Sequence, residues 1–266
     1  MSERILETAG ADRAGATEAD AAEVLARDAA ADVRAFYLQA AFRALLDAMA
    51  RPGELAELPQ PAAALKAEAA RFGMDVSTLM LADVLLDAAT SFAVAGPRAD
   101  ALERAVAGRT HAAVRPVADA AFVLVGADVR GDAAEQAVAA ASAGTLLEPH
   151  TGATMIVACG TLLGVDATGA RTGSASGSAP CEAFELAGPG VDGTARLELD
   201  RGDAVRARIA RADEFPCGID LVFVDGAGHV AAIPRSSAVT PVAAGAGAGD
   251  GAASARVQNG GTSWDM

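Results

Sequence analysis

One stretch near the C-terminal end, residues 215–235, restricts the fold more than any other part of the sequence. Its segment 219–224 reads Ile-Asp-Leu-Val-Phe-Val, a near-continuous apolar run typical of a strand covered on both faces. The next four residues, Asp-Gly-Ala-Gly, suit a tight reversal, so residues 230–233 are predicted to return antiparallel beside the first strand. The sequence therefore predicts a buried β-hairpin.

The end of this hairpin places an arginine at a defined position. Pro234 lacks an N–H group and cannot continue a central ladder, so the second strand is expected to stop there and leave Arg235 at the rim of the sheet. An arginine fixed at a strand end is a candidate anchor for phosphate or carboxylate, because its planar fork makes two parallel charge-assisted hydrogen bonds. The simpler interpretation is an ion pair with a surface carboxylate.

The remainder of the chain alternates predicted helices with predicted strands. The first helix is expected over residues 32–50, where apolar residues recur at helical spacing until Pro52 and Gly53 end it. Residues 166–180 are rich in Gly, Ser and Thr and are predicted to form an exposed loop, and residues 196–199 alternate like an edge strand. Because the final hairpin is antiparallel, these elements indicate an α/β domain with a mixed sheet. Further helices are expected at 61–71, 75–89, 97–106, 131–143 and 203–212, and strands at 91–95, 121–125, 153–158 and up to 187.

Length and local composition suggest one domain with two tails. A chain of 266 residues suits one large domain, predicted to span residues 31–240. Residues 1–30 are rich in Ala, Asp and Glu, and residues 241–266 are rich in Gly and Ala. Both ends are therefore expected to be mobile tails.

Charge and residue usage exclude several classes of function. The net charge of −14 repels nucleic acid and anionic membrane surfaces, so neither is expected as a partner. No apolar run approaches the roughly 18 residues of a membrane span, and no basic segment precedes an apolar one at the N-terminus, so a cytoplasmic location is expected. Cys159, Cys181 and Cys217 are widely separated and the histidines are isolated, which predicts reduced thiols and no metal site.

Three motifs could indicate a binding or catalytic site, but the residues around each of them weaken that interpretation. Residues 188–193 match G-x-G-x-x-G, but an alternating segment follows instead of a helix, so no dinucleotide site is expected. The only lysine, Lys66, lies on a polar, alanine-rich helix, so neither covalent pyridoxal chemistry nor any cofactor is expected. Glu148 and His150 lie in a loop at a strand entrance, a reasonable place for a site, although a structural loop is the simpler interpretation.

A row of charges accompanies the first predicted helix. Arg43, Asp47 and Arg51 recur every fourth residue and therefore share one helix face, with the carboxylate between two guanidinium groups. This pattern fits either a solvated ion-pair stripe or an ordered, partly buried polar face. Taken residue by residue, the chain shows no autonomous catalytic signature.

Five blocks of the sequence are informative when taken together and in order: residues 42–53, 85–87, 144–154, 186–191 and 215–236. They resemble the PhnH subunit of the bacterial carbon–phosphorus lyase system, and the resemblance covers about residues 34–240. The chain departs from the family at two places. The family often has Pro-Glu-x-Ser-Ala-Thr and Pro-Arg-Thr-Thr, where this chain has Pro149-His150-Thr151-Gly152-Ala153-Thr154 and Pro234-Arg235-Ser236-Ser237.

The resemblance implies a three-layer α/β/α fold similar to the large domain of pyridoxal-phosphate-dependent transferases, without the cofactor site. It also implies a homodimer within a larger assembly containing PhnG, PhnI, PhnJ and PhnK, with PhnL as a functional partner. Family members support the step in which a phosphonate displaces adenine from ATP and gives ribose 1-methylphosphonate 5-triphosphate. No catalytic residue is carried over from the family.

Three hypotheses about function follow from the residues and the resemblance together. In the first, the protein is a non-catalytic subunit whose surface positions its partners. In the second, it contributes a site for phosphonate or for the phosphates of ATP. In the third, it is a stand-alone enzyme. The residues of the second site would be Arg43, Arg51 and Arg235 as donors with Asp47 or Asp220 holding them, and those of the third Glu148 and His150.

Overall fold

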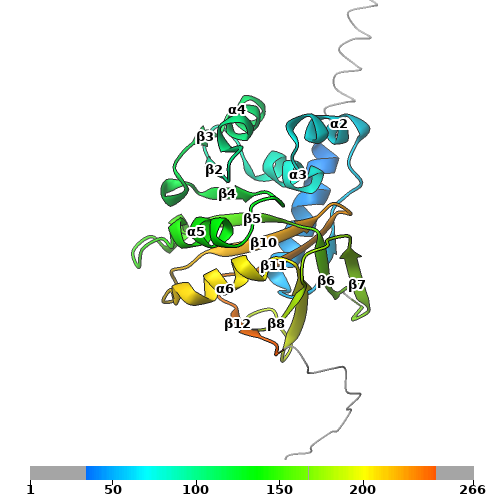
Figure 1. The fold of residues 1–266 in the computed structure, drawn as a ribbon, viewed down its shortest axis with the longest axis vertical. Coiled ribbons are helices and arrows are strands. Elements are labelled where there is room, and N and C mark those ends of the chain that lie inside the picture. The colour runs from blue at the N-terminus through cyan, green and yellow to red at the C-terminus, as the bar shows by residue number, and fades with distance from the viewer. Residues whose placement is uncertain (1–33, 167, 244–266) are drawn as a thin grey trace, which may run out of the picture.

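The hairpin predicted near the C-terminal end lies inside a seven-stranded mixed sheet (Figure 1). In the computed structural model, which describes residues 34–166 and 168–243, its strands are β10 (Asp220–Asp225) and β11 (His229–Ile233). The two strands pair antiparallel, and every residue of β10 is buried. The prediction of a buried hairpin is therefore confirmed, whereas the predicted tail 1–30 and nearly all of 241–266 lie outside the described residues.

The central sheet has the strand order β1-β11-β10-β5-β4-β2-β3. Strands β10, β5, β4, β2 and β3 run parallel, and β11 runs antiparallel to both of its neighbours. The amino ends of the parallel strands consequently share one edge of the sheet, and their carboxyl ends share the other. The remaining strands are β1 (Ala56–Glu57), β2 (Ser91–Ala95), β3 (Ala113–Val114), β4 (Phe122–Val125) and β5 (Thr154–Cys159).

Helices cover both faces of this sheet, as Figure 1 shows. One face packs through residues such as Phe92 and Ile156 against the helix of residues 34–50 and against α2, α3 and α4. The other face packs through residues such as Val157 and Phe223 against α5 and α6. Because strand side chains alternate between the two faces, β2, β4, β5, β10 and β11 each contribute to both cores. This arrangement confirms the predicted α/β class with a mixed sheet. The helices are α2 (Ala63–Phe72), α3 (Val76–Leu85), α4 (Ala99–Thr110), α5 (Asp132–Ala140) and α6 (Gly202–Arg211).

No helix within the described ranges has both the length and the apolar character needed to cross a membrane.

A second sheet, which the sequence did not predict, packs beside α6. It is antiparallel and has the order β12-β8-β9-β6-β7. The loop predicted at residues 166–180 is wrong in part, because β7 lies within it; its Gly, Ser and Thr residues are typical of a loop, and only pairing with β6 makes them a strand. The strands are β6 (Thr161–Val165), β7 (Arg171–Ala175), β8 (Glu182–Ala187), β9 (Ala195–Leu199) and β12 (Ala238–Pro241).

Two further predictions need correction. Residues 196–199 do not form an edge strand, because β9 lies between β8 and β6; the alternation arises because Leu197 and Leu199 enter the core. The helix predicted over residues 75–89 ends at Leu85, since Leu86 is extended and a turn follows in which the Asp87 amide donates to the Thr90 hydroxyl. The first error concerns the position of a strand within its sheet, and the second concerns the residue at which a helix ends.

The glycine-rich segment of residues 188–193 connects β8 to β9, which pair antiparallel. A dinucleotide fingerprint needs a helix after the turn, so that backbone N–H groups meet the pyrophosphate. A strand follows instead. The prediction that an alternating strand and not a helix follows this segment is therefore confirmed.

Candidate functional site

Asp220 and Arg235 form an ion pair at the amino edge of the parallel strands. Asp220 begins β10, and Arg235 lies two residues beyond the end of β11. Nε of Arg235 lies 3.2 Å from Oδ1 and 3.1 Å from Oδ2 of Asp220, and Nη2 lies 2.5 Å from Oδ2. The backbone N–H of Arg235 also donates to Oδ1 over 2.7 Å. Arg235 thus lies at the rim of the sheet, as predicted.

The same guanidinium group holds the loop that precedes β5. Nη1 donates to the carbonyl oxygen of Pro149 over 2.5 Å, and Nη2 donates to the carbonyl oxygen of Gly152 over 3.1 Å. Gly152 lies so close that a Cβ at this position would collide with the Arg235 guanidinium and with the carbonyl oxygen of Gly218. Nε, Nη1 and Nη2 of Arg235 therefore all have acceptors within the protein, and the side chain joins a loop to the sheet edge.

The charges of the first helix form a separate group. Nη2 of Arg51 lies 3.5 Å from Oδ1 of Asp47, and Nε of Arg51 lies 2.7 Å from Oε2 of Glu54. Arg43 is exposed on the same helix. Among the residues that the structure describes, no hydrogen bond or ion pair connects Arg43, Asp47 or Arg51 with Asp220 or Arg235. The five candidate residues consequently form two groups and not one cluster.

Four of the five sequence blocks that carry the family resemblance contact one another in two pairs. Block 42–53 meets block 186–191 at Gly190, where φ is +83° and a Cβ would collide with the carbonyl oxygen of Ala50. Blocks 144–154 and 215–236 meet where Arg235 binds the carbonyl oxygens of the loop before β5. The glycine and the arginine in these blocks therefore have structural reasons to occupy their positions.

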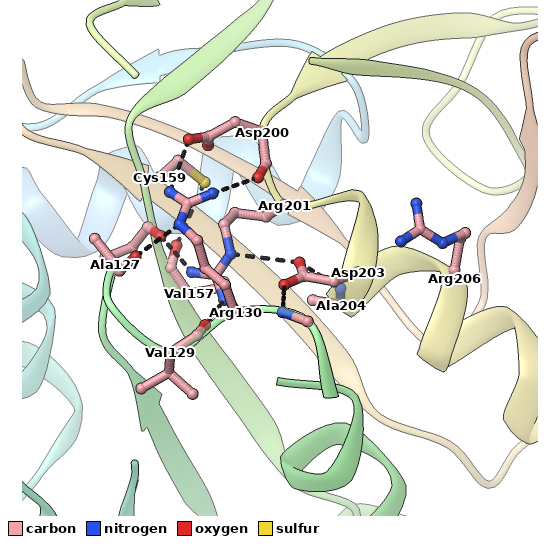
Figure 2. A network of polar contacts seen from close by, with 12 residues as sticks. Ala127, Val129, Arg130, Val157, Cys159, Asp200, Arg201, Asp203, Ala204 and Arg206 are labelled. Carbon is pink, nitrogen blue, oxygen red and sulfur yellow. Dashed lines mark hydrogen bonds and ion pairs between the residues drawn. The ribbon is translucent and has the colours of Figure 1, made fainter. Parts of the chain in front are cut away.

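At the opposite, carboxyl edge of the sheet the structure places a fully buried arginine, Arg201 (Figure 2). Nη1 of Arg201 donates to the carbonyl oxygen of Ala158 in β5, and Nη2 donates to that of Val129, both over 2.6 Å. Its Nε lies 3.4 Å from Oδ1 of Asp203 in the first turn of α6. Arg201 thus joins β5, the segment after β4 and the start of α6.

Arg130 and Asp200 extend this network, and Figure 2 shows the two side chains facing each other. The carboxylate of Asp200 is fully buried, lies 2.8 Å from Nη2 of Arg130 and accepts the backbone N–H of Gly160 over 3.1 Å. Nη1 of Arg130 donates to the backbone carbonyl oxygen of Asp200 over 2.7 Å. With Arg201 and Asp203, the network contains two guanidinium groups and two carboxylates, so its formal charges balance.

This network occupies a place that is often functional. In open α/β sheets, ligands bind outside the carboxyl ends of the parallel strands. At the ends of β4 and β5, that place is taken by the side chains of Arg201 and Arg130, which already bind acceptors of the protein itself. The arrangement here is that of an internal polar core.

Cys159, the last residue of β5, lies beside the network (Figure 2). Burial raises the pKa of its thiol well above the ordinary value, and the nearby Arg201 cation lowers it by less. A buried neutral thiol is a poor nucleophile, because the thiolate is the reactive form. The position therefore suits packing and not covalent catalysis.

Glu148 immediately precedes the short 3₁₀ turn Pro149–Thr151 and His150 lies within it, and both residues are exposed. The backbone carbonyl oxygen of Glu148 accepts the hydroxyl of Thr151 over 2.7 Å, and the next carbonyl is bound by Arg235. The backbone of this loop is thus what connects it to the rest of the molecule. These contacts are those expected of a structural loop.

Sequence reasoning missed Arg201, and also Arg208 of α6, whose Nη2 donates to the carbonyl oxygens of Pro234 and Ser237 over 2.8 and 3.1 Å. The available signal was the charged run Asp-Arg-Gly-Asp at residues 200–203, immediately before a predicted helix. Charges at a helix start are normally solvated, and nothing local distinguishes a buried arginine from an exposed one. The carbonyl oxygens that bind Arg201 belong to residues 43 and 72 positions away in the chain.

Comparison with known proteins identifies the family. A search of curated proteins found no match to the chain. A family model described as bacterial phosphonate metabolism protein (PhnH) matches residues 30–240. The matched range is most of the chain and contains both groups of candidate residues as well as the buried network around Arg201. The chain therefore belongs to the PhnH family of bacterial phosphonate metabolism proteins.

Proposed function

We propose that the protein is a cytoplasmic subunit of the carbon–phosphorus lyase core complex, and that it organises partner subunits without being catalytic by itself. The proposed partners are a second copy of the chain and the subunits PhnG, PhnI, PhnJ and PhnK, with PhnL required functionally. The reaction it would support is the displacement of adenine from ATP by methylphosphonate, which forms ribose 1-methylphosphonate 5-triphosphate. Membership of a family of phosphonate metabolism proteins supports this proposal.

The observation that carries the non-catalytic part is the buried position of Arg201. A substrate or cofactor at the carboxyl ends of β4 and β5 would have to displace its guanidinium group from the carbonyl oxygens of Ala158 and Val129. Each buried carbonyl left without a donor costs about 1–3 kcal/mol. The buried neutral thiol of Cys159 supports the same conclusion, because it offers no activated nucleophile at this edge.

Exposed apolar side chains support a role in contacts with other proteins. On the helix of residues 34–50, Phe36 is 71% exposed and Leu46 is 49% exposed. In the loops at the amino edge of the sheet, Leu147 is 94% exposed and Phe215 is 70% exposed. Large exposed apolar residues that gather on loops and on one helix are typical of surfaces that partners cover.

The test is a reconstitution followed by phosphorus NMR and by chromatography of released adenine. Methylphosphonate and ATP are incubated with this protein alone, with PhnG, PhnI and PhnL alone, and with all four proteins. Turnover only in the complete mixture is expected. Release of adenine by the single chain would contradict the non-catalytic role, and full turnover without the chain would contradict the subunit role.

A variant separates this role from the alternative in which Arg43, Arg51 and Arg235 bind the anion. If Arg235 contacts substrate, Arg235→Ala should reduce turnover while the complex still co-purifies. If Arg235 organises the amino edge, co-purification and turnover should fall together, because the loop before β5 loses its anchor.

A further inference from the structure

A tight turn in the loop of residues 144–152, before β5, presents two leucines to solvent. The backbone N–H of Thr145 donates to the carbonyl oxygen of Glu148 over 3.3 Å, and the N–H of Glu148 donates back to that of Thr145 over 3.1 Å. Leu146 and Leu147 are therefore the two central residues of the turn, and they are 67% and 94% exposed. Central turn positions are typically occupied by Gly, Pro, Asn, Asp or Ser. Turn formation thus gives no reason for two leucines at this place.

A second turn, in the loop of residues 213–218 before β10, has the same character. The N–H of Cys217 donates to the carbonyl oxygen of Glu214 over 2.9 Å, so Phe215 and Pro216 are the central residues. Proline suits this position in a turn, whereas a solvated phenylalanine has no local role there. The exposed side chains at the two tips are named here the amino-edge patch: Leu146, Leu147 and Phe215.

The fold holds these two loops next to one another. The N–H of Gly218 donates to the carbonyl oxygen of Ala143 over 2.8 Å, which joins the end of the second loop to the start of the first. Arg235 binds two carbonyl oxygens of the first loop and the carboxylate of Asp220, just after the second. Both loops lie at the same edge of the sheet, at the left of the view in Figure 1. Anchored loops lose little conformational freedom when a partner covers them, which favours binding.

Acidic side chains border the amino-edge patch. Glu148 directly follows Leu147, and Glu214 directly precedes Phe215. Both glutamates are exposed, and neither has a lysine or arginine at ion-pair distance among the residues that the structure describes. Neither loop contains a lysine or an arginine of its own. The patch therefore combines apolar tips with negative charge that no neighbouring cation neutralises.

This charge argues against a second copy of the chain as the occupant. In a two-fold dimer the same surface of each copy faces the other. The patch would then bring Glu148 and Glu214 of the two copies together, and like charges that face each other across an interface cost free energy. The net charge of −14 on each chain adds repulsion at longer range. The occupant that fits is a protein surface of opposite charge.

We propose that the amino-edge patch docks a partner subunit whose contact surface has an apolar pocket bordered by lysine and arginine side chains. The leucines and the phenylalanine would fill the pocket, and Glu148 and Glu214 would pair with the cations at its border. Buried apolar anchors supply most of the affinity of such an interface, and charges at its rim steer the encounter. The proposal rests on the subunit role proposed above and names the surface that would carry it. The proposed homodimer would use a different surface.

The experiment is biolayer interferometry with the full chain immobilised and a purified complex of PhnG, PhnI and PhnJ in solution. Binding is measured at about 50 mM and about 500 mM sodium chloride, because only the higher concentration screens charges at the rim of an interface. The variants are Glu148→Lys, Glu214→Lys and Phe215→Ala. The matched control is Glu57→Lys, which reverses an exposed carboxylate on β1 at the opposite edge of the sheet.

The wild-type chain is expected to bind less tightly as the salt concentration rises. At low salt, Glu148→Lys and Glu214→Lys should each weaken binding about fivefold or more, and at high salt by less than about twofold. Phe215→Ala should weaken binding about tenfold at both salt concentrations, because apolar burial is not screened by salt. Glu57→Lys should change the affinity less than about twofold at either concentration.

Three results would overturn the docking surface and leave the subunit role intact: unchanged affinity in Phe215→Ala, equal weakening by Glu57→Lys, or tighter binding by the two lysine variants. If Phe215→Ala unfolds early in a circular dichroism melt, Leu147→Ser takes its place, since that side chain is almost fully exposed.

Sedimentation of the chain alone tests the second copy. Loss of a wild-type dimer in Phe215→Ala would assign the patch to self-association and overturn the proposal. A wild-type chain that does not bind the complex at all would overturn the subunit role, and the docking surface with it. The two failures are therefore distinguishable, because only the second is seen in the wild type.

Discussion

The carboxylate of Asp220 accepts hydrogen bonds from both the backbone N–H and the guanidinium group of Arg235, so the start of β10 fixes the chain that leaves β11. The remaining donors of Arg235 extend this connection to the loop before β5. One side chain therefore joins three segments at the amino edge: the start of β10, the chain that leaves β11 and the loop before β5.

Arg235→Ala is expected to lower the free energy of unfolding by about 2–4 kcal/mol, because it leaves a partly buried carboxylate and two carbonyl oxygens without donors. Urea unfolding measures this loss. The matched control is Arg196→Ala, which removes a 47% exposed side chain paired with Glu198 and should cost less than about 1 kcal/mol. Equal losses in the two variants would contradict the assigned role of Arg235.

Arg201→Met should be more damaging, with an expected loss of about 3–5 kcal/mol, because it leaves a buried carboxylate without its cation and two carbonyl oxygens without donors. Arg201→Lys should recover little of this loss, since a single ammonium group cannot reach the carbonyl oxygens of Ala158 and Val129 in the geometry of the fork. Thermal and urea unfolding of both variants check this expectation. Near-complete rescue by lysine would show that charge alone matters.

We expect the carboxyl group that caps α3 to make the free energy of unfolding depend on pH. Asp75 caps this helix by accepting the N–H groups of Ser77 and Thr78 over 2.9 and 3.2 Å. Burial raises the pKa of Asp75, and Asp225 adds to the increase, while the two hydrogen bonds act against it. A raised folded-state pKa means that protonation favours the folded state, so the stabilisation from Asp75 is complete below its unfolded pKa and is lost as the pH rises through its folded pKa.

Asp75→Asn, which keeps a capping oxygen without the charge, should therefore unfold at higher urea than the wild type at pH 7. The difference should shrink as the pH falls towards 3.8, the ordinary pKa of the carboxyl. Asp75→Ala should be about 1 kcal/mol less stable than Asp75→Asn at both pH values, because neither variant carries the carboxyl and only the cap differs between them. A difference between wild type and Asp75→Asn that grows on acidification would contradict this account.

The three cysteines should differ in reactivity. Cys159 is buried and burial raises its pKa, whereas Cys181 is exposed and Cys217 is half-buried. A thiol reagent applied to the native chain should leave Cys159 unmodified, and all three thiols should react after unfolding in urea. Mass spectrometry of the peptides identifies the modified positions. Rapid modification of Cys159 in the native protein would show that the carboxyl edge opens.

Two exposed side chains test the proposed contacts with partner subunits. Leu147 and Phe215 lie in the family blocks 144–154 and 215–236, and both are mostly exposed. The double variant Leu147→Ser, Phe215→Ser should keep its stability within about 0.5 kcal/mol and should co-purify less well with the partner subunits. Val114→Ser on β3, at the far end of the sheet, is the matched control and should co-purify normally. Normal co-purification of the double variant would place the contact surface elsewhere.

Features that depend on local chemistry could be predicted from the sequence. The hairpin of β10 and β11 followed from an apolar run, a glycine-containing turn and Pro234. The pairing of Asp47 with Arg51 followed from their spacing of four residues on one helix face. The position of Arg235 at the rim followed from the proline before it. In each case, the cause and its consequence lie within a few residues of one another.

Tertiary structure alone decided the rest. Strand β7 has the composition of a loop and is a strand because β6 pairs with it. Arg201 directly precedes α6 and Arg208 lies within it, and their sequence contexts are ordinary charged patterns. Both side chains are held by carbonyl oxygens of residues 26 to 72 positions away in the chain. The sequence by itself determined the class of fold and the family, because periodicity, turn residues and family blocks are patterns among residues that are close together in the sequence. Burial determined which arginines bind carbonyl oxygens of the protein itself, because the cost of an unpaired polar group depends on everything that surrounds it.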